Sequence, residues 1–297
     1  MFVPDISRFA DFFGGFSGGV VSTIICHPLD LLKNRFSANE GNPLRPQYTG
    51  YFDAFKKIIR AEGFRGLYQG LTPSLIGASL SWGLYFQWYE VIKSNWKNNV
   101  PTGSDNLDNF ICGFISGSAV MCITNPIWLT KTRLTLQYEN QSTKMYSGMI
   151  DCMRQTVKTD GFFGLYRGFV PGLIGTTHGA IQFAVYNWMK KEQCEMLNLP
   201  ANSNLPFIYI ASFSAASKIF ATTITFPYQV LRTRLQDHNT NSRGVWQTTV
   251  RTINNEGFAG LWKGCLIANF RQLPAAVVTY VVYENVKMLA LSTKVDN

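Results

Sequence analysis

The chain has 297 residues, of which 46% are apolar and only 15% are charged, and its formal net charge is +9. Because soluble proteins carry about 25% charged residues, this composition favours a membrane class. The six Cys residues form no CxxC pair, so neither a disulfide scaffold nor a zinc site is indicated. No Gly-rich phosphate loop or nucleophile elbow is present either, so the sequence predicts no enzyme, no metal and no bound cofactor.

Six long apolar segments follow one another along the chain, with shorter amphipathic helices between them. The long segments are residues 9–36, 71–96, 107–137, 170–195, 205–236 and 265–290, and the short helices are expected near 51–61, 148–158 and 245–255. Most long segments are interrupted by Gly, Ser, Thr or a charge, as expected where one helix face meets lipid and the other a water-filled path. Residues 1–9 lack an Arg-rich amphipathic stretch, so no cleaved transit peptide is expected.

Three blocks of sequence recur in register and divide the chain into three modules. The first block is PLDLLKNR at 28–35, PIWLTKTR at 126–133 and PYQVLRTR at 227–234, at intervals of 98 and 101 residues. The second block begins with an acidic-Gly pair at Glu62, Asp160 and Glu256, and the third begins at Tyr89, Tyr186 and Tyr283. This pattern predicts three repeats of about 100 residues, 1–100, 101–200 and 201–297, in one structural domain.

These blocks resemble the mitochondrial carrier family over nearly the whole chain. The resemblance implies an all-α membrane protein with six transmembrane helices in three tandem repeats, pseudo-three-fold symmetry and short amphipathic helices on the matrix side. It also implies a multi-pass protein of the mitochondrial inner membrane that moves one small metabolite by alternating access.

Basic residues gather in the three long connections within the repeats. Segments 33–70, 131–168 and 232–264 hold 18 of the 27 Lys and Arg residues. By the positive-inside rule these segments share one face, the matrix face by resemblance, and both termini face the intermembrane space. A basic patch also suits nucleic acid or anionic lipid, but six candidate spans argue against nucleic acid. The expected partners are an anionic solute and membrane lipid, with cardiolipin as a candidate, and a monomer suffices for a three-fold repeat with a central path.

Ionisable residues in the first and third blocks predict two rings of paired side chains. A charge in hydrocarbon costs roughly 2.5–3.5 kcal/mol unless it meets a partner or a cavity. Following the pairing that the resemblance implies, we expect a proline ring, the matrix gate, of Asp30–Lys131, Trp128–Arg232 and Gln229–Lys33. We likewise expect a tyrosine ring, the cytoplasmic-side gate, of Glu90–Lys190, Asn187–Lys287 and Glu284–Lys93. With one ion pair against two, the proline ring is expected to be the weaker gate; the alternative is a static structural ring.

Polar residues that differ among the repeats are candidates for contacting the substrate. Lys218 stands where the other repeats have Gly19 and Gly117, and it lies about 20° past three full turns from Gln229, on the same helix face. An inward Lys suits an anion, although a snorkelling Lys is the alternative. Trp82 lies opposite two small positions, which leaves room for a planar group, although Trp is also common at lipid interfaces. Arg271 adds positive charge, and His178 suits either binding or helix packing.

Several segments resemble the folate/FAD carriers within the family: SWGLYF at 81–86, GTTHGAIQF at 175–183, SKIFA at 217–221 and the block with Trp128. The expected substrate-binding residues, including those carried over from the resemblance, are Gly77, Ala78, Ser81, Trp82, Ile174, Gly175, His178, Lys218, Arg271 and Gln272. The predicted function is FAD transport, with folate as the nearest rival and NAD or a pyrimidine nucleotide as the third. A carrier-fold scaffold that does not transport is the alternative from another class.

Overall fold

The computed structural model describes residues 6–40, 45–99, 105–137, 145–198, 200, 205–238 and 244–292. Within these ranges all regular structure is helical. In chain order the elements are α1 (Ile6–Ala38), α2 (Tyr51–Gly66), α3 (Leu71–Asn99), α4 (Asp105–Leu136), α5 (Met149–Asp160), η1 (Phe162–Tyr166), α6 (Phe169–Gly175), α7 (His178–Met196), α8 (Phe207–Gln236), α9 (Val245–Glu256), η2 (Phe258–Trp262) and α10 (Cys265–Ser292).

Each repeat places a long helix first, a short helix second and another long helical segment third. The first helices, α1, α4 and α8, contain the motif prolines Pro28, Pro126 and Pro227. A proline inside a helix removes one backbone hydrogen bond and permits a bend, which lets helix ends converge. The short helices α2, α5 and α9 confirm the three amphipathic helices expected from the sequence.

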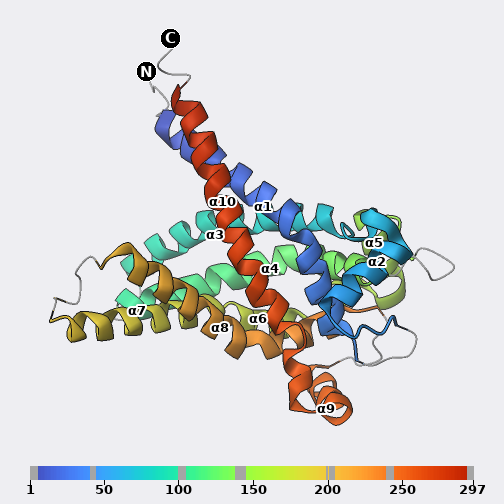
Figure 1. The fold of residues 1–297 in the computed structure, drawn as a ribbon. Coiled ribbons are helices and arrows are strands. Elements are labelled where there is room, and N and C mark those ends of the chain that lie inside the picture. Colours follow the sequence, from blue (N-terminus) through green and yellow to red (C-terminus); the bar gives the residue numbers. More distant parts are fainter. Residues whose placement is uncertain are drawn as a thin grey trace.

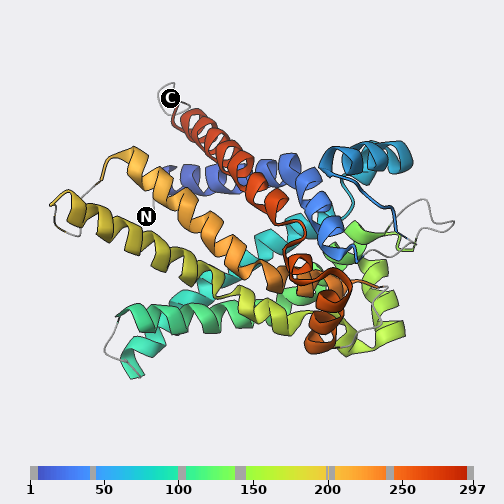
Figure 2. The ribbon, with the colours of Figure 1, turned by 60° about the horizontal axis from the view of Figure 1, so that its bottom comes forward.

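The two ends of the molecule differ in what they contain. The short helices α2, α5 and α9 lie at one end, and the N-terminal end of α1 and the C-terminal end of α10 lie at the other (Figures 1 and 2). Helices α1 and α10 run side by side, so the first and third repeats meet and close the bundle (Figure 1). The arrangement is that of a bundle of long helices with a distinct capped end, called here the short-helix end.

The segment expected to be one span at 170–195 is divided into α6 and α7. Thr176 and Thr177 separate the two helices, and their hydroxyls donate to the carbonyls of Leu173 and Ile174 at 2.7 Å each. Side-chain hydroxyls that bond back to the helix compete with its regular hydrogen bonds and bend it. The break therefore follows from two consecutive threonines and makes His178 the first residue of α7.

Four helical segments are long and apolar enough to cross a membrane by length and composition. They are Gly14–Ala38, Leu107–Leu136, Phe207–Gln236 and Phe258–Leu289. The other two expected spans correspond to α3 and to the α6–α7 pair, which fall short of that composition within the described residues. The break at Thr176 accounts for one of them, and α3 carries the charged Glu90 and Lys93 in its second half. Polar residues on a helix face that is turned to a cavity lower the mean hydropathy of a membrane-spanning helix.

Small residues on α1 let α10 approach closely. A Cβ atom at Gly18 would lie 2.8 Å from the carbonyl oxygen of Thr279, and one at Gly14 would lie 2.9 Å from the ring of Tyr283. By contrast, a Cβ at Gly15 or Gly19 would meet nothing within 4 Å. Of the two overlapping Gly-x-x-x-Gly pairs on this helix, Gly14 and Gly18 therefore form the packing face.

Candidate binding cavity and the two rings

Three buried arginines join the long helices at the short-helix end. Arg35, Arg133 and Arg234 are the last residues of the Pro blocks and are at most 2% exposed. The Nε of each donates to a backbone carbonyl of the next long helix: Arg35 to Thr135 at 3.0 Å, Arg133 to Gln236 at 3.2 Å and Arg234 to Ser37 at 3.0 Å. The three bonds form a closed cycle through α1, α4 and α8, which holds the helix ends together.

The acid of each acidic-Gly pair binds the arginine of its own repeat. The distances are 2.5 Å for Arg35–Glu62, 3.0 Å for Arg133–Asp160 and 2.8 Å for Arg234–Glu256. Sequence reasoning did not assign this role, although the recurrence of both groups in all three repeats was the available signal. Each pair ties a short helix to the long helix before it.

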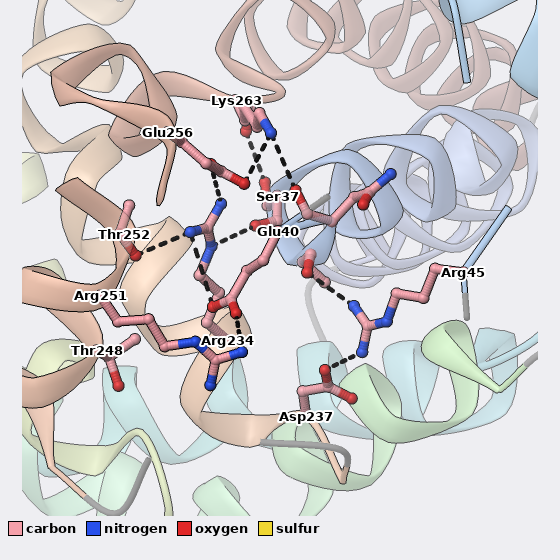
Figure 3. A network of polar contacts seen from close by, with 12 residues as sticks. Ser37, Glu40, Arg45, Arg234, Asp237, Thr248, Arg251, Thr252, Glu256 and Lys263 are labelled. Atoms are coloured by element: carbon pink, nitrogen blue, oxygen red, sulfur yellow. Dashed lines mark hydrogen bonds and ion pairs between the residues drawn. The ribbon is translucent and has the colours of Figure 1, made fainter. Parts of the chain in front are cut away.

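The seam between the third and first repeats holds further ion pairs (Figure 3). Glu40, after α1, binds Arg251 of α9 at 2.5 Å, and Arg45 pairs with Asp237 after α8. Burial lowers the pKa of the neighbouring His238, so Arg45 is the cation that faces Asp237 at neutral pH. Counted from the motif prolines, neither Glu40 nor Asp237 has an acidic counterpart in the other repeats, so this seam is specific to one side of the bundle.

The proline ring contains one ion pair, between Asp30 and Lys131. Arg271 approaches the same carboxylate, with Nε 3.7 Å from the other Asp30 oxygen. One aspartate therefore faces two cations from two different helices. The Asp30 side chain is 17% exposed and that of Lys131 is 10% exposed, so the pair is largely withdrawn from solvent.

Trp128 and Arg232 do not face each other as expected. Trp128 packs on α3, where its Nε1 donates to the Ser81 hydroxyl at 3.4 Å and a Cβ at Gly77 would lie 3.4 Å from its ring. Arg232 lies beside α6, and its buried Nη2 has no hydrogen-bond partner within the described residues. Within the described residues the indole of Trp128 therefore contacts Ser81 and Gly77 of α3, and the expected contact between Trp128 and Arg232 is not formed.

The expected hydrogen bond between Gln229 and Lys33 is also absent from the described part of the chain. Lys33 Nζ instead lies 5.9 Å from the centre of the Phe226 ring. A neutral amide attracts an ammonium group much less than a carboxylate does, so nothing holds Lys33 across the ring. Both Lys33 and Gln229 line a cavity next to the proline ring.

That cavity has a volume of about 430 Å³ and lies between α1, α7, α8 and α10. Three cationic side chains from three helices line it: Lys33, Lys218 and Arg271. No carboxylate is among its lining residues, and its remaining wall is formed by amides, hydroxyls, alanines, His178 and Tyr280. Four of the predicted substrate-binding residues therefore share one cavity, namely His178, Lys218, Arg271 and Gln272.

Two threonines of α8 orient polar groups of this cavity. The Thr225 hydroxyl donates to Ala221 O at 2.6 Å, so it accepts a hydrogen bond from His178 Nδ1 at 3.0 Å. In the same way the Thr222 hydroxyl donates to Lys218 O at 2.8 Å and accepts from Gln272 Nε2 at 2.9 Å. The two threonines thus orient the imidazole and the amide, and the Gln272 amide also donates to Asn269 Oδ1 at 3.5 Å. No pattern in the sequence indicated either threonine.

The other predicted substrate-binding residues lie outside this cavity. Gly77 and Ser81 contact Trp128, and a Cβ at Gly175 would lie 2.7 Å from the Tyr228 ring. Ala78 is half-buried, Ile174 is exposed, and Trp82 is 62% exposed and stacks on Phe86 with ring centres 5.7 Å apart. Trp82 lies about 20° past three turns from Lys93, so it shares a face of α3 with the tyrosine ring.

The tyrosine ring is open. Within the described residues no ion pair joins Glu90 to Lys190 or Glu284 to Lys93, so the pairs expected from the sequence are not formed in this conformation. Lys93 Nζ lies 5.4 Å from the Tyr89 ring centre, and Lys287 lies at the same distance from Tyr283. Glu90, Lys93, Asn187 and Glu284 are exposed, and Lys190 and Lys287 are half-buried. In the described part of the chain the proline ring, at the short-helix end, is therefore closed by one ion pair, whereas the expected ion pairs of the tyrosine ring are not formed.

A helical bundle of three repeats, with span-length apolar helices, a cationic cavity and one closed ring, defines a membrane-embedded solute carrier. The chain belongs to the mitochondrial carrier protein family, whose model matches residues 5–100, 103–196 and 203–294. Its relatives in this family are transporters, and no group of three or more His, Cys, Asp or Glu residues within the described ranges is placed to hold a metal ion.

Three relatives cover almost the whole chain. It is 35% identical to folate transporter 1, chloroplastic, of Arabidopsis thaliana, over 93% of each chain. It is 33% identical to the mitochondrial FAD carrier protein FLX1 of Saccharomyces cerevisiae, over 92% of this chain and 94% of the relative. It is also 33% identical to nicotinamide adenine dinucleotide transporter 1, chloroplastic, of Arabidopsis thaliana, over 92% of this chain and 89% of the relative. The names of these relatives give folate, FAD and nicotinamide adenine dinucleotide as the molecules that they carry.

Proposed function

We propose that this protein carries FAD, or a closely related flavin, across the inner mitochondrial membrane by alternating access. The observation that most supports an anionic solute is the cavity that Lys33, Lys218 and Arg271 line without a carboxylate. The segments around Trp82, His178 and Lys218 resemble the folate/FAD group and favour a flavin or a folate over NAD. In this proposal the proline ring and the tyrosine ring are the two gates.

Each predicted substrate-binding residue has a chemical role in this proposal. Lys218 and Arg271 bind the phosphates, and His178 and Gln272 donate or accept hydrogen bonds beside them. Trp82, on the open face of α3, stacks on the isoalloxazine ring. Gly77, Ala78, Ser81, Ile174 and Gly175 are small or apolar residues that let the ring system approach the backbones of α3 and α6.

The proposed orientation follows from the distribution of charge. The segments rich in Lys and Arg lie at the short-helix end, which we assign to the matrix by the positive-inside rule. Both termini then face the intermembrane space, and the open tyrosine ring faces the same side. The path runs inside one bundle, so we propose a monomer that needs only membrane lipid around it.

Folate is the second candidate, because the relative named as a folate transporter matches this chain as well as the FAD carrier does. NAD is the third for the same reason. Each of these molecules combines a flat heteroaromatic ring with anionic groups, which suits the same cavity. A scaffold without transport is the alternative from another class, although buried gate charges such as Asp30 and Lys131 offer little to a static bundle.

The test is uptake into liposomes that contain the purified protein. FAD, FMN, riboflavin, tetrahydrofolate and NAD are compared with wild type and Lys218→Ala. Uptake of FAD that Lys218→Ala reduces by at least about tenfold would support the proposal, because a charged hydrogen bond is lost. Uptake of tetrahydrofolate or NAD alone would replace the substrate, and no uptake of any compound would favour the scaffold.

A further inference from the structure

Lys33 belongs to the proline ring by sequence but has no carboxylate partner there. Its counterpart Lys131 pairs with Asp30, whereas the position that faces Lys33 in the ring is Gln229. Within the described residues Lys33 forms no ion pair, and its Nζ lies 5.9 Å from the centre of the Phe226 ring. Because Gln229 is neutral, Lys33 is left available to bind another anion.

The side chain of Lys33 lines the same cavity as Lys218 and Arg271. These three cations come from α1, α8 and α10, so they surround the cavity rather than follow one helix. The nearest acid is Asp30, which approaches Arg271 at 3.7 Å but already pairs with Lys131. Four cations thus face one carboxylate in this region, which leaves a local charge of about +3 in a medium of low dielectric constant.

A charge excess of this kind in a membrane protein is stabilised by an anion or by water in a cavity. A single negative charge would satisfy one of the three cavity cations. A group with two negative charges close together can meet cations from two different helices at the same time. The cavity volume of about 430 Å³ is near the low end for ligand sites, about 300–1000 Å³, which suits a compact anionic group with part of a ring.

We propose that Lys33 is a substrate-binding residue that, with Lys218 and Arg271, holds a compact dianionic group of the transported molecule. This inference rests on the proposed function as a carrier of anionic solutes and names the chemical class that the cavity selects. The substrate thereby supplies, next to the proline ring, the negative charge that Gln229 does not. Two phosphates of a dinucleotide and two carboxylates of a folate share this chemistry.

The test measures equilibrium binding to the purified full-length protein in nanodiscs. The probes are FAD and inorganic pyrophosphate with adjacent phosphates, tetrahydrofolate with two carboxylates, and riboflavin without a charged tail. The variants are Lys33→Gln, Lys33→Arg, and Lys56→Gln as a control on the exposed face of α2. Lys33→Gln is expected to weaken the dianions by at least about tenfold, while Lys33→Arg retains their affinity within about threefold.

The pattern across probes separates a binding role from a gate role. A residue that acts only in the gate would change the affinity of every probe, including riboflavin, by one common factor, and that result would overturn the proposal. Unchanged affinity for every dianion in Lys33→Gln, or no binding of any dianion to wild type, would overturn it as well. Loss of tetrahydrofolate affinity in a protein that does not bind FAD would support the role of Lys33 and refute the flavin proposal separately.

Discussion

At the scale of single residues, the three arginine–acid pairs of the short-helix end differ in whether the acid also binds a second cation. Asp160 also binds Arg167 at 2.9 Å, and Glu256 also binds Lys263 at 2.8 Å. Glu62 has the neutral Gln69 in the matching position, at 3.1 Å. The three pairs look equivalent in the repeat pattern, but only Glu62 depends on a single cation.

Arg35→Gln is therefore expected to destabilise the protein more than Arg133→Gln. Glu62 is 4% exposed and would become a buried carboxylate without a cation, which costs about 3–5 kcal/mol. Asp160 is 20% exposed and would keep Arg167, so the second variant should lose clearly less. Thermal unfolding of both variants in the same detergent measures the difference. Equal or reversed losses would contradict this account of the pairs.

At the scale of helices, the contact between α1 and α10 depends on which glycines face the partner. Gly18→Ala would place a Cβ 2.8 Å from the Thr279 carbonyl oxygen, so the two helices must separate. We expect a loss of about 1–3 kcal/mol from this overpacking. Gly19→Ala is the matched control, because its Cβ meets nothing within 4 Å and alanine favours the helix.

Thermal unfolding of the two alanine variants tests this packing face. A lower midpoint for Gly18→Ala and an unchanged or higher midpoint for Gly19→Ala is the expected result. The reverse order would show that the other face of α1 packs on α10.

The sequence predicted the helical elements well, because each depends on local pattern. The motif prolines lie inside α1, α4 and α8, and the three expected amphipathic helices are α2, α5 and α9. The break between α6 and α7 was not predicted, since it depends on the hydrogen bonds of two threonine hydroxyls. Of the acid–base pairs expected in the two rings, Asp30–Lys131 is formed within the described residues, whereas Glu90–Lys190 and Glu284–Lys93 are not, because such pairs depend on the conformational state. Trp128 turns to α3, and the tyrosine ring is parted.

At the scale of the whole molecule, transport requires that the proline ring open as easily as it closes. That ring has one ion pair, so acids at its two other positions should over-stabilise the closed state. Trp128→Asp is expected to lower the maximal transport rate at unchanged KM, since Arg232 does not line the cavity. Gln229→Asp should lower the rate and also raise KM, because the new acid engages Lys33. Initial rates in liposomes measure both constants, and unchanged rates in both variants would count against a gate.

The seam between the third and first repeats has an ion pair between repeats that has no counterpart at the position of Lys57. Glu40, which follows α1, binds Arg251 of α9 at 2.5 Å, across two repeats. Lys57 lies five residues before Glu62, as Arg251 lies five residues before Glu256, but it binds Asp53 of its own helix at 2.8 Å. A double-mutant cycle of Glu40→Gln and Arg251→Gln is expected to give a coupling energy of about 0.5–3 kcal/mol in thermal unfolding. The cycle of Glu40→Gln with Lys57→Gln should give no coupling energy, because these two side chains share no partner.

The seam holds the short-helix end together, so Glu40→Gln should also shift the protein away from the conformation with a closed proline ring. The measurement is the labelling rate of a cysteine introduced by Gln229→Cys, with a water-soluble thiol reagent added from the short-helix end. Faster labelling with Glu40→Gln is the expected result. Equal labelling with and without Glu40→Gln would mean that the seam stabilises the fold and has no part in the gate.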